Sequence, residues 1–269
     1  MNRKIHYFAV TSLILIWAGP VRGQAAPRPK EKDAPAAAVA DAKLPSAQEV
    51  SDKYAKGSGG KEAWAKLKTM VMTGTIDIPT YNVSGKVEIF AKRPNKALQI
   101  STVADGQFVQ KQGFDGQAGW EFDTQKGLRA VTGQRLEQVK VESIFDTDSH
   151  LNEVYPDLKV TGRSKVGDRD AYVVVAHEPG GKTLTMYMDT QTGLRIAEDS
   201  EGPDETGTVV KANLLFEDYR AAGDVKIPYR IRIQAPNISL VITIEDVKLN
   251  DPVDDAKFAM PAANSGSTQ

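Results

Sequence analysis

Acidic residues recur at short spacing beside glycine in the stretch GFDGQAGWEFDTQKGLRAV, residues 113–131. Carboxylates at such spacing could coordinate a hard cation, and a pair of them could run acid/base chemistry. The same five-residue loop, Asp followed four positions later by Gly, nevertheless occurs at 115–119, 123–127 and 189–193. Asp can hydrogen-bond the backbone that follows it, and Gly adopts the left-handed conformation that returns a hairpin. A catalytic site has no reason to recur on successive hairpins, so we interpret these loops as turns.

The sequence D-T-D-S-H places Asp146, Asp148 and His150 within five positions. If the segment is helical, Asp146 and His150 share a face, and a metal-dependent hydrolase is the chemistry such a group could support. We interpret the group as a solvated helix end. The other histidine beyond the N-terminal segment, His177, is expected at an exposed strand end, and the acidic run 198–205 is expected to form a solvated hairpin loop. No nucleophile-elbow, zinc-protease, Walker or dinucleotide motif is present, so we predict no catalytic residue, no metal and no cofactor.

The N-terminus has the pattern of a secretory signal peptide. Arg3 and Lys4 precede a short apolar core at 8–18, and small residues follow. We therefore expect residues 1–25 to be a cleaved signal peptide and the protein to be periplasmic. Residues 26–45, rich in Ala, Pro and charge, are expected to form a flexible linker because they contain too little apolar surface to order themselves.

Cysteine content and charge exclude several classes of protein. The chain has no cysteine, which excludes disulfides, thiolate metal sites and the acylated cysteine of a lipoprotein. Residues 1–25 contain three basic residues and no acidic one, so their removal changes the formal net charge from -1 to -4. A mildly acidic chain without a basic block predicts no nucleic-acid partner.

The apolar pattern predicts a single mainly β domain at 46–262. Ser46 and Glu49 form a capping box that starts a helix, and residues 61–68 have the spacing of a second short helix. From Met70 onward the apolar period becomes two, which is typical of antiparallel hairpins. Residues 133–152 return to helical spacing. We predict one extensive, strongly bent antiparallel sheet with a few α-helices covering its concave face, followed by a disordered tail at 263–269.

Alternation in these strands assigns many large apolar side chains to one face of the sheet, more than a few short helices can cover tightly. This face can be an ordinary packed core or a concave cavity for an acyl chain. The residues assigned to it are Met70, Met72, Ile76, Val87, Ile89, Leu98, Ile100, Met186, Met188, Leu214, Phe216, Ile231, Ile233, Leu240 and Ile242.

Three parts of the sequence carry a family resemblance: L-P-S-A-Q-E-V-S-D-K-Y with G-G-K-E-A-W-A-K-L-K, M-Y-M-D-T-Q-T-G-L-R, and F-E-D-Y-R-A-A-G-D-V-K-I-P-Y-R-I-R-I. They resemble the outer-membrane lipoprotein-sorting family, the LolA-like and LppX-like periplasmic lipid carriers. The resemblance covers residues 44–261 and implies an open, incomplete β-barrel of about eleven strands with a helical lid. No functional residue of that family can be matched by position.

The leading functional hypothesis is a periplasmic carrier, not an enzyme, that binds lipoprotein acyl chains or another lipid through the apolar face. Such a chaperone would serve lipoprotein sorting or lipid transport. The resemblance implies inner- and outer-membrane sorting proteins as partners, and we expect a monomer. One alternative is a cell-envelope interaction module with a packed core and no ligand. The other is the metal-dependent hydrolase that would use Asp146, Asp148 and His150.

Overall fold

The computed structural model describes residues 9–10, 14–15, 43–203 and 208–262. The predicted flexible linker up to Ala42 and the tail at 263–269 lie outside the described residues, as does most of the predicted signal peptide. Within that peptide, β1 (Ala9–Val10) and β2 (Ile14–Leu15) pair as a two-stranded antiparallel sheet.

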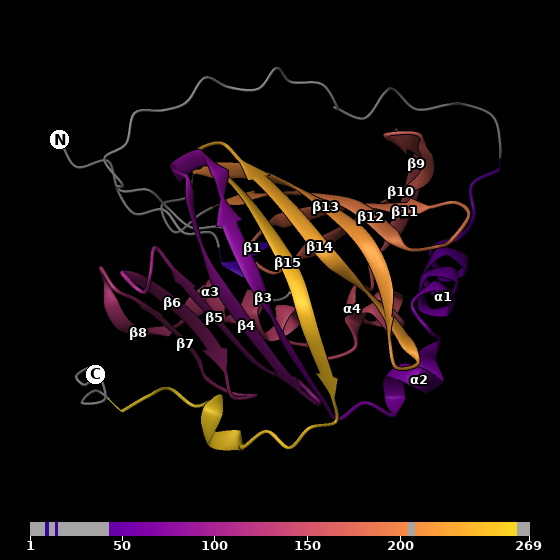
Figure 1. Cartoon of the computed structure of the whole chain (residues 1–269). Helices are drawn as coiled ribbons and strands as arrows, with labels where there is room; N and C mark the ends of the chain where they lie inside the picture. The colour runs from indigo at the N-terminus through magenta and orange to yellow at the C-terminus, as the bar shows by residue number, and fades with distance from the viewer. Residues whose placement is uncertain (1–8, 11–13, 16–42, 204–207, 263–269) are drawn as a thin grey trace.

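One antiparallel sheet of thirteen strands dominates the described chain, in the order β8-β7-β6-β5-β4-β3-β15-β14-β13-β12-β11-β10-β9 (Figure 1). Its strands are β3 (Thr69–Ile78), β4 (Val83–Lys92), β5 (Lys96–Val103), β6 (Phe108–Phe114), β7 (Gly119–Asp123), β8 (Gly127–Val131), β9 (Lys159–Val166), β10 (Arg169–Glu178), β11 (Lys182–Asp189), β12 (Arg195–Pro203), β13 (Val209–Ala222), β14 (Val225–Ala235) and β15 (Ile238–Leu249). Strands β3 to β8 and β9 to β15 form two meanders, which are joined where β3 pairs with β15. The predicted bent, open antiparallel sheet is confirmed, with two strands more than the resemblance implied.

Helices lie before the sheet and between its two edges. Their bounds are α1 (Ala47–Gly57), α2 (Lys61–Ala65), α3 (Gly133–Glu142) and α4 (Leu151–Val154), with 3-10 turns η1 (Pro79–Tyr81), η2 (Thr147–Ser149) and η3 (Asp255–Lys257). Edge strands β8 and β9 are connected by residues 132–158, here called the bridging segment, which carries α3, η2 and α4 across the concave side of the sheet (Figure 1). None of the helices in the described ranges is long and apolar enough to cross a membrane.

Helix α1 begins as its sequence predicts. The Ser46 hydroxyl accepts a hydrogen bond from the Glu49 backbone N–H, and the Glu49 carboxylate accepts one from the Ser46 N–H at 2.7 Å, which completes the capping box. Val50 and Tyr54, one turn apart, lie on the side of the helix that faces the sheet and are buried there. Helix α2 is three residues shorter than expected, although Trp64 is buried as its spacing indicates.

The repeated Asp loops are turns, as predicted. In each copy the Asp Oδ1 accepts hydrogen bonds from the two backbone N–H groups that lie two and three residues further on. Gly127 and Gly193 have φ of 73° and 78°, as a hairpin-returning glycine requires. The first copy differs: Gly116 has the positive φ, of 101°, and Gly119 begins β7. The prediction for Gly119 was therefore wrong.

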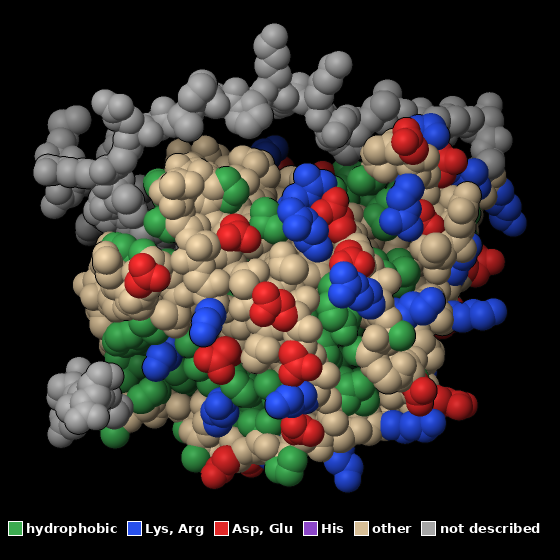
Figure 2. Space-filling view, in the orientation of Figure 1, with side chains coloured by type: hydrophobic (Ala, Val, Ile, Leu, Met, Phe, Trp, Pro, Cys, Tyr) green, Lys and Arg blue, Asp and Glu red, His purple; other side chains and the backbone are tan. Residues whose placement is uncertain are grey.

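The convex face is partly covered by the chain after β15, residues 250–260, here called the C-terminal strap. Phe258 is fully buried, and its carbonyl accepts a 2.8 Å hydrogen bond from Trp120 Nε1. Asp255 lies 2.7 Å from Lys92 and 2.8 Å from Lys96. Elsewhere on this face acidic and basic side chains are interspersed (Figure 2). The strap thus covers part of the convex face with the apolar side chains of Val253 and Phe258.

Candidate functional site

The buried side chains of the central apolar surface on the concave face all come from strands, and Tyr81 of η1 packs against them at less complete burial. Thirteen buried side chains from β3, β4, β5, β13, β14 and β15 contact each other there, and no described helix contributes to the set. We call it the concave apolar cluster. Its members are Ile76, Ile78, Val87, Ile89, Val103, Ala212, Leu214, Phe216, Ile233, Ile238, Leu240, Ile242 and Ile244, with Met72 and Ile231 partly buried against it.

Strand register explains why these residues share a face. Ile76 pairs with Ile242, and Ile242 pairs in turn with Ile231. Ile231 then pairs with Phe216, so one row of apolar side chains crosses four adjacent strands. Side chains directly opposite each other in neighbouring strands point to the same side of the sheet. The alternation in sequence therefore becomes a continuous apolar surface only through these pairings.

Most of the predicted lipid-binding residues lie in this cluster, but three lie beneath helices. Met186 and Met188 are fully buried under α1 and α4 with Val50, Tyr54 and other residues. Met70 is buried in a separate group with Trp64 and Leu67, close to α2. Their environment is that of a packed core between helix and sheet. These three methionines are therefore set apart from the concave apolar cluster.

Leu98 and Ile100 lie on the opposite, convex face, so assigning them to the apolar concave face was wrong. Ile89 on the concave face pairs with Gln99, which turns both neighbours of Gln99 outward. Leu98 is buried with Phe258 beneath the C-terminal strap. Alternation within β5 is ambiguous, because both of its faces carry enough apolar residues to be buried.

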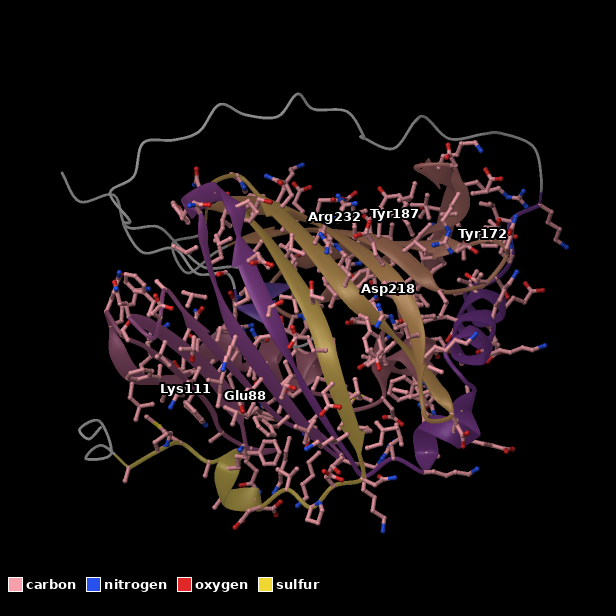
Figure 3. All side chains as sticks on the ribbon, in the orientation of Figure 1. Glu88, Lys111, Tyr172, Tyr187, Asp218 and Arg232 are labelled. Carbon is pink, nitrogen blue, oxygen red and sulfur yellow. The ribbon has the colours of Figure 1, made fainter. Side chains whose placement is uncertain are left out.

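The residues that lie opposite Ile100 agree with this direction. It lies opposite Glu88 of β4 and Lys111 of β6, two charged residues on the outer surface of this part of the sheet (Figure 3). The Lys111 ammonium lies 5.8 Å from the Phe122 ring centre, a cation–π contact on that surface. A half-buried isoleucine among such residues belongs to the convex face.

A charged network covers the concave side of β7 and β8. The Arg129 guanidinium donates to Glu121 and to Asp123, both at 2.7 Å. From α3, Arg135 lies 3.6 Å from Glu121 and donates to Glu142 at 3.0 Å. Both acids that face Arg129 are at least nine-tenths buried. The network therefore fixes α3 to the first meander through ion pairs of low solvent exposure.

The same network reaches across to the second meander. Lys182 of β11, only 3% exposed, lies 3.2 Å from Glu142 of α3 and 2.6 Å from Glu178 of β10. The Tyr155 hydroxyl donates to Glu178 at 3.1 Å. Burial raises the pKa of Glu178, and nearby Glu142 adds to this, although the positive charge of Lys182 opposes it. Helix α3 is therefore tied to the first meander through Arg135 and to the second through the contact of Glu142 with Lys182.

The acidic run expected to form a solvated loop is largely a strand. Residues 195–203 form β12, in which Glu198 is fully buried on the concave face. Its carboxylate accepts a 2.9 Å hydrogen bond from Arg195, whose guanidinium stacks 4.4 Å from the Phe216 ring centre. Asp199 on the other face accepts a 2.7 Å hydrogen bond from Tyr187. These hydrogen bonds offset the cost of removing the carboxylates of Glu198 and Asp199 from water. Because of that cost, the acidic composition of this segment had favoured a solvated loop.

The candidate hydrolase residues do not form a proton relay. The Ser149 hydroxyl lies 2.6 Å from His150 Nδ1, and Asp146 lies 3.5 Å from the same ring nitrogen. A relay needs the nucleophile and the acid on different ring nitrogens. Asp146 instead accepts a 2.8 Å hydrogen bond from Arg93. Among residues whose side chains are described, which omits that of Asp148, no cluster of three or more His, Asp or Glu could hold a metal.

His177 lies at the exposed end of β10, as predicted. Its side chain is 60% exposed and contacts Asp157. Hydrogen bonds from His177 lower the pKa of Asp157, although burial acts in the opposite direction. The pair lies on the surface, which is the environment of an exposed ion pair and not of a desolvated catalytic dyad.

Comparison with known proteins defines the fold. No family model matches the sequence, and no curated protein matches it either. Among solved structures, the chain is similar to a LolA superfamily protein from Nitrosomonas europaea, with a TM-score of 0.55 and 14% identity over 80% of this chain and 98% of that one. It is also similar to a DUF1329 family protein from Desulfovibrio piger, with a TM-score of 0.53 and 15% identity over 79% and 97%.

A third similar structure is a domain described as an outer membrane lipoprotein-sorting protein, from Vibrio parahaemolyticus. Its TM-score is 0.52, with 10% identity over 78% of this chain and 94% of that one. At these identities the likeness is one of fold. The chain therefore has a LolA-like fold: an open, curved antiparallel sheet with helices on its concave side.

Proposed function

We propose that this protein is an exported periplasmic carrier that binds the acyl chains of a lipoprotein or of another lipid on its concave face, without catalysing a reaction. The observation that carries the proposal is the concave apolar cluster, a continuous surface drawn from six strands to which no described helix contributes. The helices α1, α2 and α4 contribute to other clusters. The LolA-like fold supports the proposal, since one similar structure is described as a lipoprotein-sorting domain.

The driving force would be burial of the acyl chain. Each methylene removed from water contributes about 0.8 kcal/mol, so a dozen contribute on the order of 10 kcal/mol before the opposing terms. One opposing term is the displacement of packed atoms, because Leu214 and Ile242 are fully buried and an acyl chain can reach them only by moving the atoms that now surround them. The other is the loss of motional freedom of the bound lipid. The balance is that of reversible binding.

Opening of the concave face to admit an acyl chain would involve α3. This helix is held to the first meander by Arg135 and to the second by the contact of Glu142 with Lys182. Separation of the two meanders must therefore break at least one of these ion pairs. Lids that close over bound ligands commonly move on the microsecond to millisecond timescale. We expect the carrier to load its cargo through such a movement.

A matched pair of variants tests the site. Ile231 and Ile100 are both half-buried strand isoleucines, but Ile231 lies on the concave face and Ile100 on the convex face. The measurement is titration of a fluorescent fatty-acyl probe into the exported protein. We expect Ile231→Ser to weaken probe binding by about tenfold, since a polar group would meet the chain, and Ile100→Ser to leave it unchanged.

Two results would contradict the carrier proposal. One is the absence of saturable probe binding by the wild-type protein, which would favour the interaction module with a packed core. The other is an equal effect of the two substitutions, which would place binding elsewhere. Organic extraction and mass spectrometry of the protein purified from its own periplasm would then identify the cargo, because a carrier retains lipid through a mild purification.

A further inference from the structure

In two adjacent rows of the concave face, the side chains change from apolar to polar between β4 and β5. Ile89 of β4 pairs with Gln99 of β5, and Gln99 pairs with Gln112 of β6. The neighbouring row on the same face repeats the change, from Val87 to Ser101 and Gln110. Gln99, Ser101 and Gln110 are all buried. The flanking rows of β5 and β6 stay apolar, with Val103 opposite Phe108 and Ala97 opposite Phe114. The polar side chains therefore form a buried patch that borders apolar surface, an arrangement that suits the polar end of an amphiphile.

A small cavity lies on the polar side of this boundary, between α3 and strands β5 and β6. It encloses about 20 Å³, and its polar lining consists of Gln99, Gln112, Glu142 and Ser143. A cavity of this size admits one hydroxyl or one water molecule. It therefore can receive the tip of a polar head but not a whole head group in the closed conformation.

One acceptor at this cavity has no donor. Gln99 is 2% exposed, and its amide nitrogen donates to Ser101 Oγ at 3.3 Å. Its carbonyl oxygen, Oε1, accepts no hydrogen bond from any described residue. A buried unpaired acceptor is destabilising, and native proteins pair nearly all such groups. The missing partner is a hydrogen-bond donor.

Charge at the cavity argues against an anionic partner. The Glu142 carboxylate lining it already accepts hydrogen bonds from Arg135 and Lys182. Those two cations are therefore engaged. The polar groups that line the cavity are two amides, a hydroxyl and a carboxylate, and Ala97, Phe114 and Val139 complete the lining. An anionic head would be desolvated beside Glu142 without a cation of its own. A neutral head with O–H or N–H groups fits the site.

We propose that the polar surface of β5 and β6 beneath α3 binds the uncharged head of the carried amphiphile, and that Gln99 Oε1 accepts a hydrogen bond from a hydroxyl or amide of that head. The acyl chain then runs from Gln99 over Ile89 of β4 and Met72 of β3, which follow it in the same row. The inference rests on the proposed carrier function and adds the polarity and chemical class of the cargo.

The test compares three ligands with the same acyl chain: a monoacylglycerol, the fatty-acid methyl ester and the fatty-acid anion. Each ligand is used to displace a fluorescent acyl probe from the exported protein. We expect the wild type to bind the monoacylglycerol about tenfold more tightly than the ester, the difference of one well-formed hydrogen bond, and to bind the anion no more tightly than the ester.

The variant Gln99→Met removes the unpaired oxygen with little change in volume. We expect it to lose the preference for monoacylglycerol, to bind the methyl ester as the wild type does, and to melt at an equal or higher temperature because the buried orphan acceptor is gone. The control is Gln107→Met, which changes the exposed glutamine of the β5–β6 turn and should retain the preference.

The outcomes separate the two proposals. If the wild type binds none of the three ligands, the carrier proposal fails and this inference fails with it. If the wild type binds the ester and the monoacylglycerol equally, or if Gln99→Met keeps the preference, the head-group assignment is overturned while the carrier proposal stands, and the cavity holds water only. Tightest binding of the anion would likewise overturn the assignment of a neutral head.

Discussion

Replacing Lys182 by methionine should destabilise the protein at neutral pH by about 3 to 5 kcal/mol, the range measured when one partner of a buried ion pair is removed. Lys182 is 3% exposed and lies 2.6 Å from Glu178, whose side chain is fully buried. Glu142 would keep its 3.0 Å hydrogen bond from Arg135. Among the described residues, the hydrogen bond that Glu178 would keep is the one from the Tyr155 hydroxyl, a neutral donor. The uncompensated charge is therefore that of Glu178.

The loss should depend on pH with a definite sign. The folded-state pKa of Glu178 already lies above its usual value, mainly because of burial, and removal of the Lys182 charge raises it further. An ionised carboxylate with a raised folded-state pKa destabilises the folded state above that pKa. The penalty disappears as pH falls through the folded pKa toward the ordinary value of about 4.3. The Lys182→Met variant should therefore lose less stability at about pH 5 than at about pH 7.

Urea denaturation followed by tryptophan fluorescence measures both effects. The double variant Lys182→Met/Glu178→Gln removes both charges of the pair and should recover to within about 1 kcal/mol of the wild type, since buried ion pairs can be replaced by neutral groups at little cost. The control Lys165→Met breaks an exposed pair with Asp170 and should change stability by less than about 0.5 kcal/mol. A loss below about 1 kcal/mol for Lys182→Met, or no recovery in the double variant, would refute this account of the network.

Three further changes have expected outcomes in thermal or urea denaturation. Gly193→Ala should destabilise the protein by about 2 to 3 kcal/mol, because φ is 78° and the new Cβ would lie 2.5 Å from a backbone oxygen of α1. The control Gly127→Ala has φ of 73° but open space around the new Cβ, and should cost about 1 kcal/mol. Equal losses for the two variants would contradict the predicted clash. Phe258→Ala should destabilise the protein by about 3 to 5 kcal/mol, because the Phe258 ring is fully buried. The control Met260→Ala should be nearly neutral, because Met260 is 42% exposed. A neutral effect of Phe258→Ala would mean that the C-terminal strap does not stabilise the sheet. Asp255→Asn should lower the melting temperature slightly at low salt and not at about 0.5 M salt, because solvent reaches the ion pairs of Asp255 with Lys92 and Lys96 and salt screens them. A loss that does not depend on salt would contradict this expectation.

Local sequence signals predicted the local structure well. Ser46 and Glu49 specified the start of α1, and the Asp loops specified turns, because both depend on hydrogen bonds within a few residues. The bounds of β4 and β15 match the apolar alternation in the sequence. The bent sheet followed from many such strands in succession. These features are encoded over short distances along the chain.

Features that depend on distant partners could not be read from the sequence. The face of Leu98 is set by the register of β5 against β4 and by the C-terminal strap, which follows it by about 150 positions. The burial of Glu178 depends on Lys182 and on a helix that precedes both. Composition suggested that acidic residues lie in solvent, and only the positions of their partners show otherwise. The unpaired oxygen of Gln99 had no sequence signal at all.

The joining of β3 to β15 has a consequence for how the protein reaches its native state. All other neighbouring strands in the large sheet are consecutive along the chain, so most hairpins can form from residues that are near each other in sequence. The pairing of Ile76 with Ile242 closes nearly the whole domain into one loop, and contacts so distant in sequence form slowly. Until β15 emerges, the free edge of β3 presents unpaired backbone groups that can recruit strands of other molecules. Late formation of this one strand pair therefore makes incompletely folded molecules prone to aggregation, and chains truncated before β15 should depend on holding chaperones to stay in solution.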